Sequence, residues 1–284
     1  MHLDERKSKE IEHSDRRRSI VRAYEYHTDA SPDQLDEKYV EGGSNYERHF
    51  SNMKFYSITR SSVSCRDALL FDRVKGAVAL DYCCGNGEVA VEMAKRGARK
   101  VMGIDISQVA IENAKELAES QGVGKICEFR VMDAEHTEFA DNTFDIIHEY
   151  GALHHLELKS AFSELPRILK RSGKLVCTEA LRHNPLIHWY RRRTPHLRTA
   201  WEIEHILGVE HLDVLRAHFD RVEVKFFHLL ALAAVPFRKT FLFRPLRGFL
   251  DFVDDIVLRH PWIGKYAWMM VITSNEPRKR VGPS

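Results

Sequence analysis

Acidic residues that end apolar segments are the first candidates for chemistry in this sequence. Asp81 ends the apolar run 77–80 and leads into a turn that contains Gly85 and Gly87, and Asp105 ends the next apolar run. The glycines have no Cβ, so the turn can adopt positive φ, and amide groups at the start of a following helix can face a polar ligand. An acid about twenty residues beyond such a turn is placed to accept hydrogen bonds from ribose hydroxyls. The two features together predict a nucleoside-binding site.

The elements that would position these acids follow from the spacing of apolar residues. Apolar runs alternate with segments of helical spacing, which predicts parallel strands joined by right-handed helical crossovers. In such a sheet, ligands lie beyond the carboxyl ends of the strands. We expect strands at 77–81, 100–104, 126–131, 144–149, 175–179, 222–227 and 266–273, and helices at 86–96, 107–121, 157–171 and 209–218. Chemistry is therefore expected at the five tips that carry Asp81 to Gly87, Asp105, Asp133, Glu149 to His155 and Glu179 to His183.

Several of these tips carry motifs of a known family. The segment 81–87 resembles the DxGxGxG motif of class I S-adenosylmethionine-dependent methyltransferases, and Gly103-Ile-Asp-Ile-Ser107 resembles their second motif. Further matches lie at 131–134, 144–148 and 151–156, and the turn at 171–174 is similar to the family's LKxGG signature. The resemblance covers roughly residues 75–182. Cys83 stands where the family has its first glycine, so we expect the backbone there to adopt a conformation that a side chain tolerates.

The resemblance implies a cofactor and its contacts. The cofactor is S-adenosyl-L-methionine, Asp133 occupies the position at which the family accepts a hydrogen bond from the adenine amino group, and the segment before the first strand closes over the cofactor. The implied contacts are Asp81, Cys83, Gly85, Gly87, Asp105, Ile106, Asp133, Ala134, Glu149 and Tyr150. Tyr46, His49, Tyr56 and Arg60 could then face the active site, although packing on the sheet explains these side chains equally well.

A general base is expected among the later strand tips. If the acceptor is a hydroxyl or an enolisable carbon, a proton must leave it during methyl transfer. His154 follows the fourth strand and has a suitable unperturbed pKa, so it is the first candidate, with Glu149, Glu179 and His183 after it. Two alternatives stay open. His154 could have a purely structural role, with a hydrogen bond that holds its loop, or methylation could proceed by proximity without a base.

Composition excludes several other classes of protein. The net charge of +2 over 284 residues argues against general binding of nucleic acid. Five cysteines without CxxC spacing predict reduced thiols, with neither a disulfide framework nor a metal site. The mixed charges at the N-terminus are unlike a signal peptide, and the longest apolar run, 229–237, is too short to span a bilayer. We therefore expect a cytoplasmic protein.

Three segments lie outside the motifs. Residues 1–22 are dense in charge and predict a solvated helix. The run 191–193 predicts a helix with solvated arginines and a packed apolar face (Leu186, Ile187 and Tyr190), with an RNA surface or an anionic-substrate loop as alternatives. The insertion 229–265 contains a helix between Pro245 and Pro261 whose use is open between core or dimer packing, a lid over an apolar substrate, and shallow membrane contact.

These observations predict an α/β fold: a Rossmann-like, doubly wound and mainly parallel seven-stranded sheet with an antiparallel last strand. Residues 1–72 would form a helical cap, and residues 73–284 the methyltransferase domain with its insertion. The expected function is transfer of a methyl group to oxygen or carbon of a small lipophilic metabolite. The alternatives are an RNA or protein methyltransferase and a non-catalytic cofactor-binding protein. A homodimer and peripheral membrane contact are left open as partners.

Overall fold

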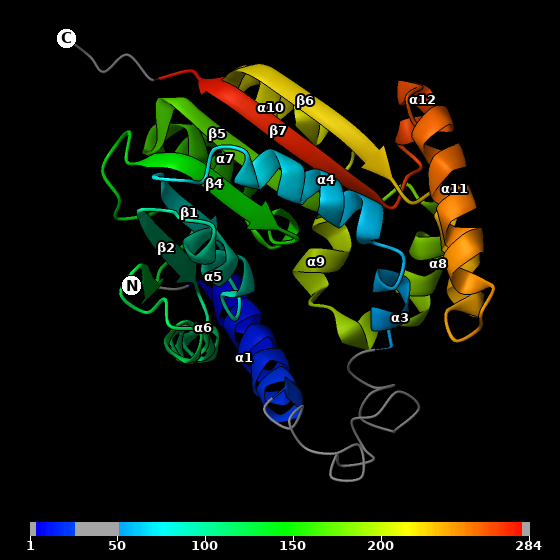
Figure 1. Cartoon of the computed structure of the whole chain (residues 1–284), viewed down its shortest axis with the longest axis horizontal. Coiled ribbons are helices and arrows are strands. Elements are labelled where there is room, and N and C mark those ends of the chain that lie inside the picture. Colours follow the sequence, from blue (N-terminus) through cyan, green and yellow to red (C-terminus); the bar gives the residue numbers. More distant parts are fainter. Residues whose placement is uncertain (1–3, 26–50, 280–284) are drawn as a thin grey trace.

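A seven-stranded sheet forms the centre of the molecule (Figure 1). The computed structural model describes residues 4–25 and 51–279, without the side chains of residues 20–25 and 261. The strand order is β3-β2-β1-β4-β5-β7-β6; the first five strands are parallel and β7 is antiparallel to both β5 and β6, as the sequence predicts. The strands are β1 (Val78–Tyr82), β2 (Lys100–Asp105), β3 (Cys127–Val131), β4 (Phe144–Tyr150), β5 (Leu169–Ala180), β6 (Phe219–Phe227) and β7 (Met269–Pro277).

Helices cover both faces of this sheet. The chain-ordered helices are α1 (Glu5–Glu25), α3 (Met53–Tyr56), α4 (Arg60–Phe71), α5 (Glu88–Lys95), α6 (Gln108–Ser120), α7 (Leu158–Ile168), α8 (Pro185–Arg193), α9 (Ala200–His205), α10 (His211–His218), α11 (Phe243–Val257) and α12 (Pro261–Gly264), with short 3₁₀ turns η3 (Leu153–His155), η4 (Pro195–Leu197) and η5 (Ala231–Phe237). Successive strand residues point to opposite faces, so Ala79 packs with α5 and α6 whereas Leu80 packs with α7 and α10. A sheet buried on both faces explains why its strands read as continuous apolar runs.

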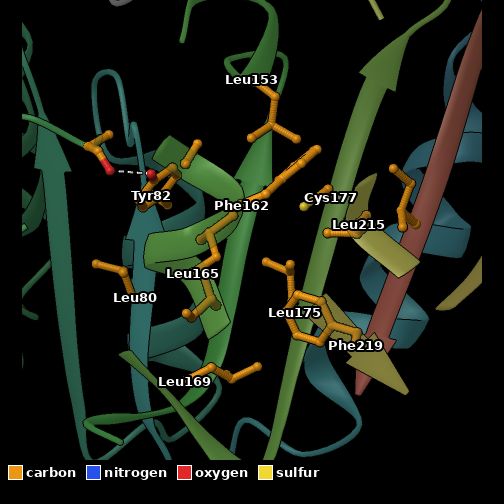
Figure 2. Packing of buried hydrophobic residues seen from close by; sticks show 14 of the residues in the cluster. Leu80, Tyr82, Leu153, Phe162, Leu165, Leu169, Leu175, Cys177, Leu215 and Phe219 are labelled. Atoms are coloured by element: carbon orange, nitrogen blue, oxygen red, sulfur yellow. Dashed lines mark hydrogen bonds between the residues drawn. The ribbon is translucent and has the colours of Figure 1, made fainter. Parts of the chain in front are cut away.

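The larger core lies between the sheet and the helices α7 and α10 (Figure 2). Phe162 and Leu165 of α7 point at Leu80, Leu175 and Cys177 of the sheet, and all five side chains are fully buried. The hydroxyl of Tyr82 donates a hydrogen bond to the backbone oxygen of Ala134, which ties the end of β1 to the loop after β3. The core thus fixes the strand tips at which the site is expected.

The structure differs from the sequence-based expectations at β5. This strand begins at Leu169 rather than at 175, because Leu169 already pairs with Phe144 before an irregularity and the pairing resumes at Lys174. The predicted turn 171–174 is therefore part of the strand, and α7 ends at Ile168 rather than at 171.

The helix at the N-terminus also departs from expectation. The predicted solvated helix is present as α1, but it lies against α6 and turns a row of charged side chains toward the strand tips. The basic run of α8 differs in a similar way. Ile187 and Tyr190 are buried as predicted, whereas Leu186 is exposed and Arg191 turns inward to donate to the backbone oxygen of Leu181 at 2.9 Å.

Candidate active site

A cavity of about 540 Å³ opens where the parallel strands end. One side is lined by the turn after β1 and by the tips of β2 and β3, the other by α3, α8 and the start of β7, and α1 closes a third side. Most of the predicted contact residues line it: Asp81, Cys83, Gly85, Asp105, Ile106, Asp133, Ala134, Tyr150 and His154. Gly87, Glu149, Glu179 and His183 do not.

The turn after β1 has the backbone geometry of a glycine loop although its first glycine is replaced. Cys83 has φ +60°, Gly85 +53° and Gly87 +83°. Cys83 adopts the left-handed region, which a residue with a side chain tolerates at a cost of about 1–2 kcal/mol. Gly85 faces the cavity, where a Cβ would lie 2.6 Å from Nη2 of Arg18; a Cβ on Gly87 would instead meet that of Ala114 at 2.8 Å. Gly87 therefore allows close packing of the turn on α6.

Asp81 holds this turn in place. One carboxylate oxygen accepts the amide of Ala90 at 3.0 Å, in the first turn of α5, and the other lies 2.8 Å from Nδ1 of His148 on β4. Both side chains are buried. A buried carboxylate with two such partners has a structural role, so Asp81 shapes the site chiefly by fixing the start of α5.

Asp105 stands at the tip of β2 beside the turn. Its Oδ2 accepts the amide of Gly85 at 3.0 Å and its Oδ1 accepts the amide of Ser107 at 2.9 Å. Each carboxylate oxygen has a second lone pair, so these bonds orient Asp105 and leave acceptor capacity toward the cavity. Ser107 also caps α6, as the sequence predicts, since its hydroxyl accepts the amide of Ala110 at 3.0 Å.

Asp133 is engaged by the N-terminal helix. Its Oδ2 accepts from Nζ of Lys7 at 2.7 Å, and the same ammonium group lies 2.9 Å from the buried Glu135. Arg6 donates to Glu135 at 2.6 Å. Burial alone would lower the pKa of Lys7, but its hydrogen bonds to the two acids raise it above the ordinary value. In this structure a cation from α1 thus occupies the acceptor that the sequence assigned to an adenine amino group.

Glu149 lies behind the wall of the cavity. One carboxylate oxygen accepts the amide of Ala152 at 2.6 Å and, more weakly, that of Leu153 at 3.3 Å; the other has no partner among the described residues. Burial and then the nearby Glu179 raise the pKa of Glu149 well above its ordinary range. A buried carboxyl that accepts from its own loop and does not line the cavity is unsuited to act as a base, so Glu149 supports the turn after β4.

His154 and Glu179 form a dyad at the edge of the cavity. Nδ1 of His154 lies 2.8 Å from Oε2 of Glu179, whose other oxygen accepts the amide of Leu153 at 2.7 Å. Because a carboxylate only accepts, Nδ1 carries a proton, and Nε2 is the ring nitrogen that is not bonded to Glu179. Burial lowers the pKa of His154, but Glu179 and then Glu202 more than offset this, so the pKa of His154 lies above its ordinary value.

Cations gather beyond this dyad. Nε of Arg198 lies 3.2 Å from Glu202, whose carboxylate is 4.0 Å from Nε2 of His154. Burial, and then the neighbouring Arg198, lower the pKa of Arg191 to about 10. Ligand atoms of His154, His155 and Glu202 lie within 4.8 Å of one another, a spacing that would admit a cation. The surrounding guanidinium groups oppose a further positive charge there and favour an electron-rich ligand.

The opposite wall is apolar and aromatic. Phe55, Tyr190 and Trp268 stack edge to face, with ring centroids 4.8 Å apart for Phe55 and Tyr190 and 6.1 Å for Phe55 and Trp268. Tyr56 also lines the cavity, its ring 5.4 Å from that of Trp268. Tyr56 is thus one of the four residues before the first strand that, from the sequence, could face the active site. Of the other three, Arg60 is exposed and does not line the cavity, and Tyr46 and His49 lie outside the described residues.

Sequence reasoning missed the contribution of α1. Its cavity side consists of polar residues spaced by three or four, and they bind the loop residues directly: Glu10 lies 2.8 Å from Nδ1 of His155 and accepts from Thr199 at 2.5 Å. A helix that buries charges leaves no apolar stripe in the sequence, so the expected signal of packing was absent. The row is Arg6, Lys7, Glu10, His13, Ser14, Arg17 and Arg18.

Comparison with known proteins bears on the same part of the chain. Residues 80–177 match the family model described as a methyltransferase domain. Together with the strand order, this confirms the recognition made from the motifs: the chain contains a class I methyltransferase domain. The match covers the turn after β1, the tips of β2 to β4 and most of β5.

Relatives and structures of the same kind are similar to this chain. A demethylmenaquinone methyltransferase of Lactiplantibacillus plantarum is 33% identical over 122 residues, which is 40% of this chain and 52% of that protein. A 27-O-demethylrifamycin SV methyltransferase of Amycolatopsis mediterranei is 28% identical over 156 residues, covering 54% of this chain and 56% of the relative. The chain thus spans about half the length of the curated relatives it matches.

Among solved structures, a geranyl diphosphate C-methyltransferase of Streptomyces coelicolor, in complex with Mg²⁺, geranyl diphosphate and S-adenosyl-L-homocysteine, superposes with a TM-score of 0.52 at 15% identity. The match covers 75% of this chain and 78% of that one. At this identity the likeness shows the fold alone, which is the Rossmann-like arrangement expected from the sequence.

Proposed function

We propose that this protein transfers the methyl group of S-adenosyl-L-methionine to an oxygen or carbon atom of a small lipophilic molecule. The observation that carries the proposal is a single cavity with a polar nucleoside half, an apolar aromatic half, and the His154–Glu179 dyad beside it. The relatives named above, which act by their names on demethylmenaquinone and a demethylrifamycin, support an acceptor of this kind.

The residues of the polar half fit the adenosyl group. Asp105 keeps free lone pairs for the ribose hydroxyls, while Ile106 and Ala134 offer apolar surfaces on either side of an adenine ring. Gly85 has no Cβ and so leaves room at the turn beside the guanidinium of Arg18. Lys7 must release or share Asp133 when an adenine amino group binds there, so we propose that α1 adjusts as the cofactor enters.

When bound, S-adenosyl-L-methionine supplies an activated methyl group, so the protein has to position the acceptor and exclude water. The wall of Phe55, Tyr190 and Trp268 would hold the apolar body of the acceptor. Nε2 of His154 would take the proton from the acceptor atom as its bond to the methyl carbon forms, and Glu179 would stabilise the resulting imidazolium through Nδ1. Arg191 and Arg198 lie where a developing oxyanion would be stabilised.

The test is transfer of a labelled methyl group. Protein would be incubated with S-adenosyl-L-methionine labelled in the methyl group and with a panel of prenylated hydroquinones and polyketide phenols. We expect label in one class of acceptor together with release of S-adenosyl-L-homocysteine, and loss of about 10²- to 10⁴-fold in rate for His154→Gln. The matched control is His188→Gln, since His188 is exposed on α8. Failure to bind S-adenosyl-L-homocysteine would refute the proposal, and full activity of His154→Gln would refute the base.

A further inference from the structure

The insertion between β6 and β7 presents an apolar surface that no described element covers. We define the aromatic face as Phe241, Phe249, Phe252, Ile256 and Trp262. Phe241 is 89% exposed, Trp262 70%, Phe252 65% and Phe249 63%. Single exposed apolar residues are ordinary on protein surfaces, but Phe249, Phe252 and Ile256 recur at helical spacing on one side of α11, and such an exposed apolar stripe marks an interaction site. Within the described residues, α11 and α12 stand at the edge of the molecule (Figure 1).

The fold holds this face outward. The inner side of α11 packs through Leu246 and Leu250 on η5 and the aromatic wall. The buried Asp254 fixes the register, because its carboxylate accepts the amides of Leu229 at 3.1 Å, Leu230 at 2.8 Å and Ala231 at 3.0 Å. Since these contacts already satisfy the inner side of the helix, Phe249, Phe252 and Ile256 cannot turn inward as well. The outer side of α11 is therefore apolar as well, although the core uses only the inner side.

Charge around the aromatic face is mainly positive. The segment 237–266 contains six lysines and arginines against three acids, Asp251, Asp254 and Asp255. Asp254 is buried, and Asp251 accepts from Ser61 and lies 3.8 Å from Arg247. Arg244 is exposed near the start of α11, and Lys265 follows α12. Arg259 is also exposed, just beyond the end of α11, and pairs with the third acid, Asp255, at 2.7 Å. Exposed aromatic residues bordered by basic ones are the pattern of a helix that lies in the headgroup region of an anionic bilayer.

The inner side of α11 connects the helix that carries the aromatic face to the wall of the cavity. Leu246 and Leu250 belong to one apolar cluster with Phe55, Tyr190 and Trp268, which line the cavity. A protein that binds a membrane through α11 would therefore hold the apolar wall of its cavity next to the lipid. Among the described residues, no helix is long and apolar enough to cross a membrane.

We propose that the aromatic face docks this protein on the surface of a membrane that contains anionic phospholipids. A second copy of the chain is the competing occupant. In a two-fold dimer through this face the patch would meet itself, so two surfaces of the same net positive charge would face each other. That repulsion favours a negatively charged partner. The proposal goes beyond methyl transfer and its test needs no acceptor.

The experiment measures binding to vesicles of phosphatidylcholine with and without 30% phosphatidylglycerol, a fraction on the order of that in anionic membranes. We expect wild-type protein to sediment with the anionic vesicles and to be released by salt. Phe249→Ser/Phe252→Ser should lower the partition coefficient at least tenfold. Arg244→Gln and Arg259→Gln should lower it about fivefold each on anionic vesicles only. Val214→Ser, at an exposed apolar position on α10, is the matched control and should bind as wild type does.

Two further readouts separate the outcomes. Affinity for S-adenosyl-L-homocysteine should be the same in all variants, which shows that they are folded and keeps this test apart from that of the methyltransferase activity. Wild-type protein that ignores anionic vesicles at low salt would overturn the proposal. A stable dimer that dissociates in Phe249→Ser/Phe252→Ser without any vesicle binding would also overturn it and assign the face to a second copy.

Discussion

Replacement of Glu179 by glutamine should lower the pKa of His154 and disturb its tautomer. In the present structure the two oxygens of Glu179 accept from two different donors, Nδ1 of His154 and the amide of Leu153. A glutamine side chain has only one oxygen, so it can satisfy one of these donors and must turn its NH₂ group toward the other. If the oxygen stays on Leu153, the NH₂ group faces Nδ1 and moves the imidazole proton to Nε2.

The magnitude follows from the geometry. Opposite charges about 4 Å apart attract by about 4 kcal/mol at an effective dielectric of about 20, and the measured effect of such a partner is about 1–3 pKa units. Glu179 is the larger of the two acidic influences on His154, and Glu202 at 4.0 Å is shared with Arg198. We therefore expect a fall of about 1–3 units in Glu179→Gln and of less than about 1 unit in the matched variant Glu202→Gln.

Nuclear magnetic resonance of the histidine ring nitrogens measures both quantities without an acceptor. A titration of protein labelled with ¹⁵N in its histidines gives the pKa of His154, and the Nδ1 and Nε2 shifts give the tautomer; His154→Gln assigns the signals. Wild-type protein should show an elevated pKa and a proton on Nδ1. An unchanged pKa and tautomer in Glu179→Gln would refute the dyad, and a larger shift in Glu202→Gln would assign His154 to a different partner.

Three further predictions concern stability. Chemical denaturation should give Cys83→Gly a free energy of unfolding equal to or above that of wild type. Cys83→Val should be about 1–2 kcal/mol less stable than Cys83→Gly, because a β-branched residue tolerates φ +60° least. Equal stability of the two variants would contradict strain at this position. Asp254→Ala should cost about 3 kcal/mol, as three amides lose their acceptor, while the exposed Asp255→Ala should be near neutral. Burial lowers the pKa of His228 to about 3, so below pH 6.5 the unfolded chain binds a proton that the native chain does not. The free energy of unfolding should therefore decrease as the pH is lowered from about 6.5 to about 3, by up to about 1.4 kcal/mol per pH unit. His228→Asn should flatten that slope relative to wild type, and an unaltered slope would show that His228 does not cause it.

The parallel half of the fold could be predicted from the sequence because local signals and burial agree there. Runs such as 77–80 are apolar on both faces, and Ser107 and the glycine turn mark helix starts by their own chemistry. The tips that carry Asp105, Asp133 and His154 were found for the same reason, since a parallel sheet brings its carboxyl ends together.

The remaining parts of the site depend on tertiary contacts that leave no local pattern. Lys7 and Arg6 face acids more than a hundred residues away, and a charged stripe on a helix looks the same whether it meets solvent or buried carboxylates. Arg191 belongs to a run of three arginines, and only the packing of α8 decides which one turns inward. Glu149 lies near the end of β4 and His154 follows that strand, but a difference in the direction of their side chains separates a loop support from a candidate base.

The central claim is that one adenosyl group binds between the turn after β1 and the tips of β2 and β3. Its most direct test is a crystal structure of the protein with S-adenosyl-L-homocysteine. We predict ribose hydroxyls within hydrogen-bond distance of Asp105, adenine between Ile106 and Ala134, and Lys7 displaced from Asp133 or sharing it. A nucleoside bound elsewhere, or an Asp105 carboxylate turned away from the sugar, would contradict the account.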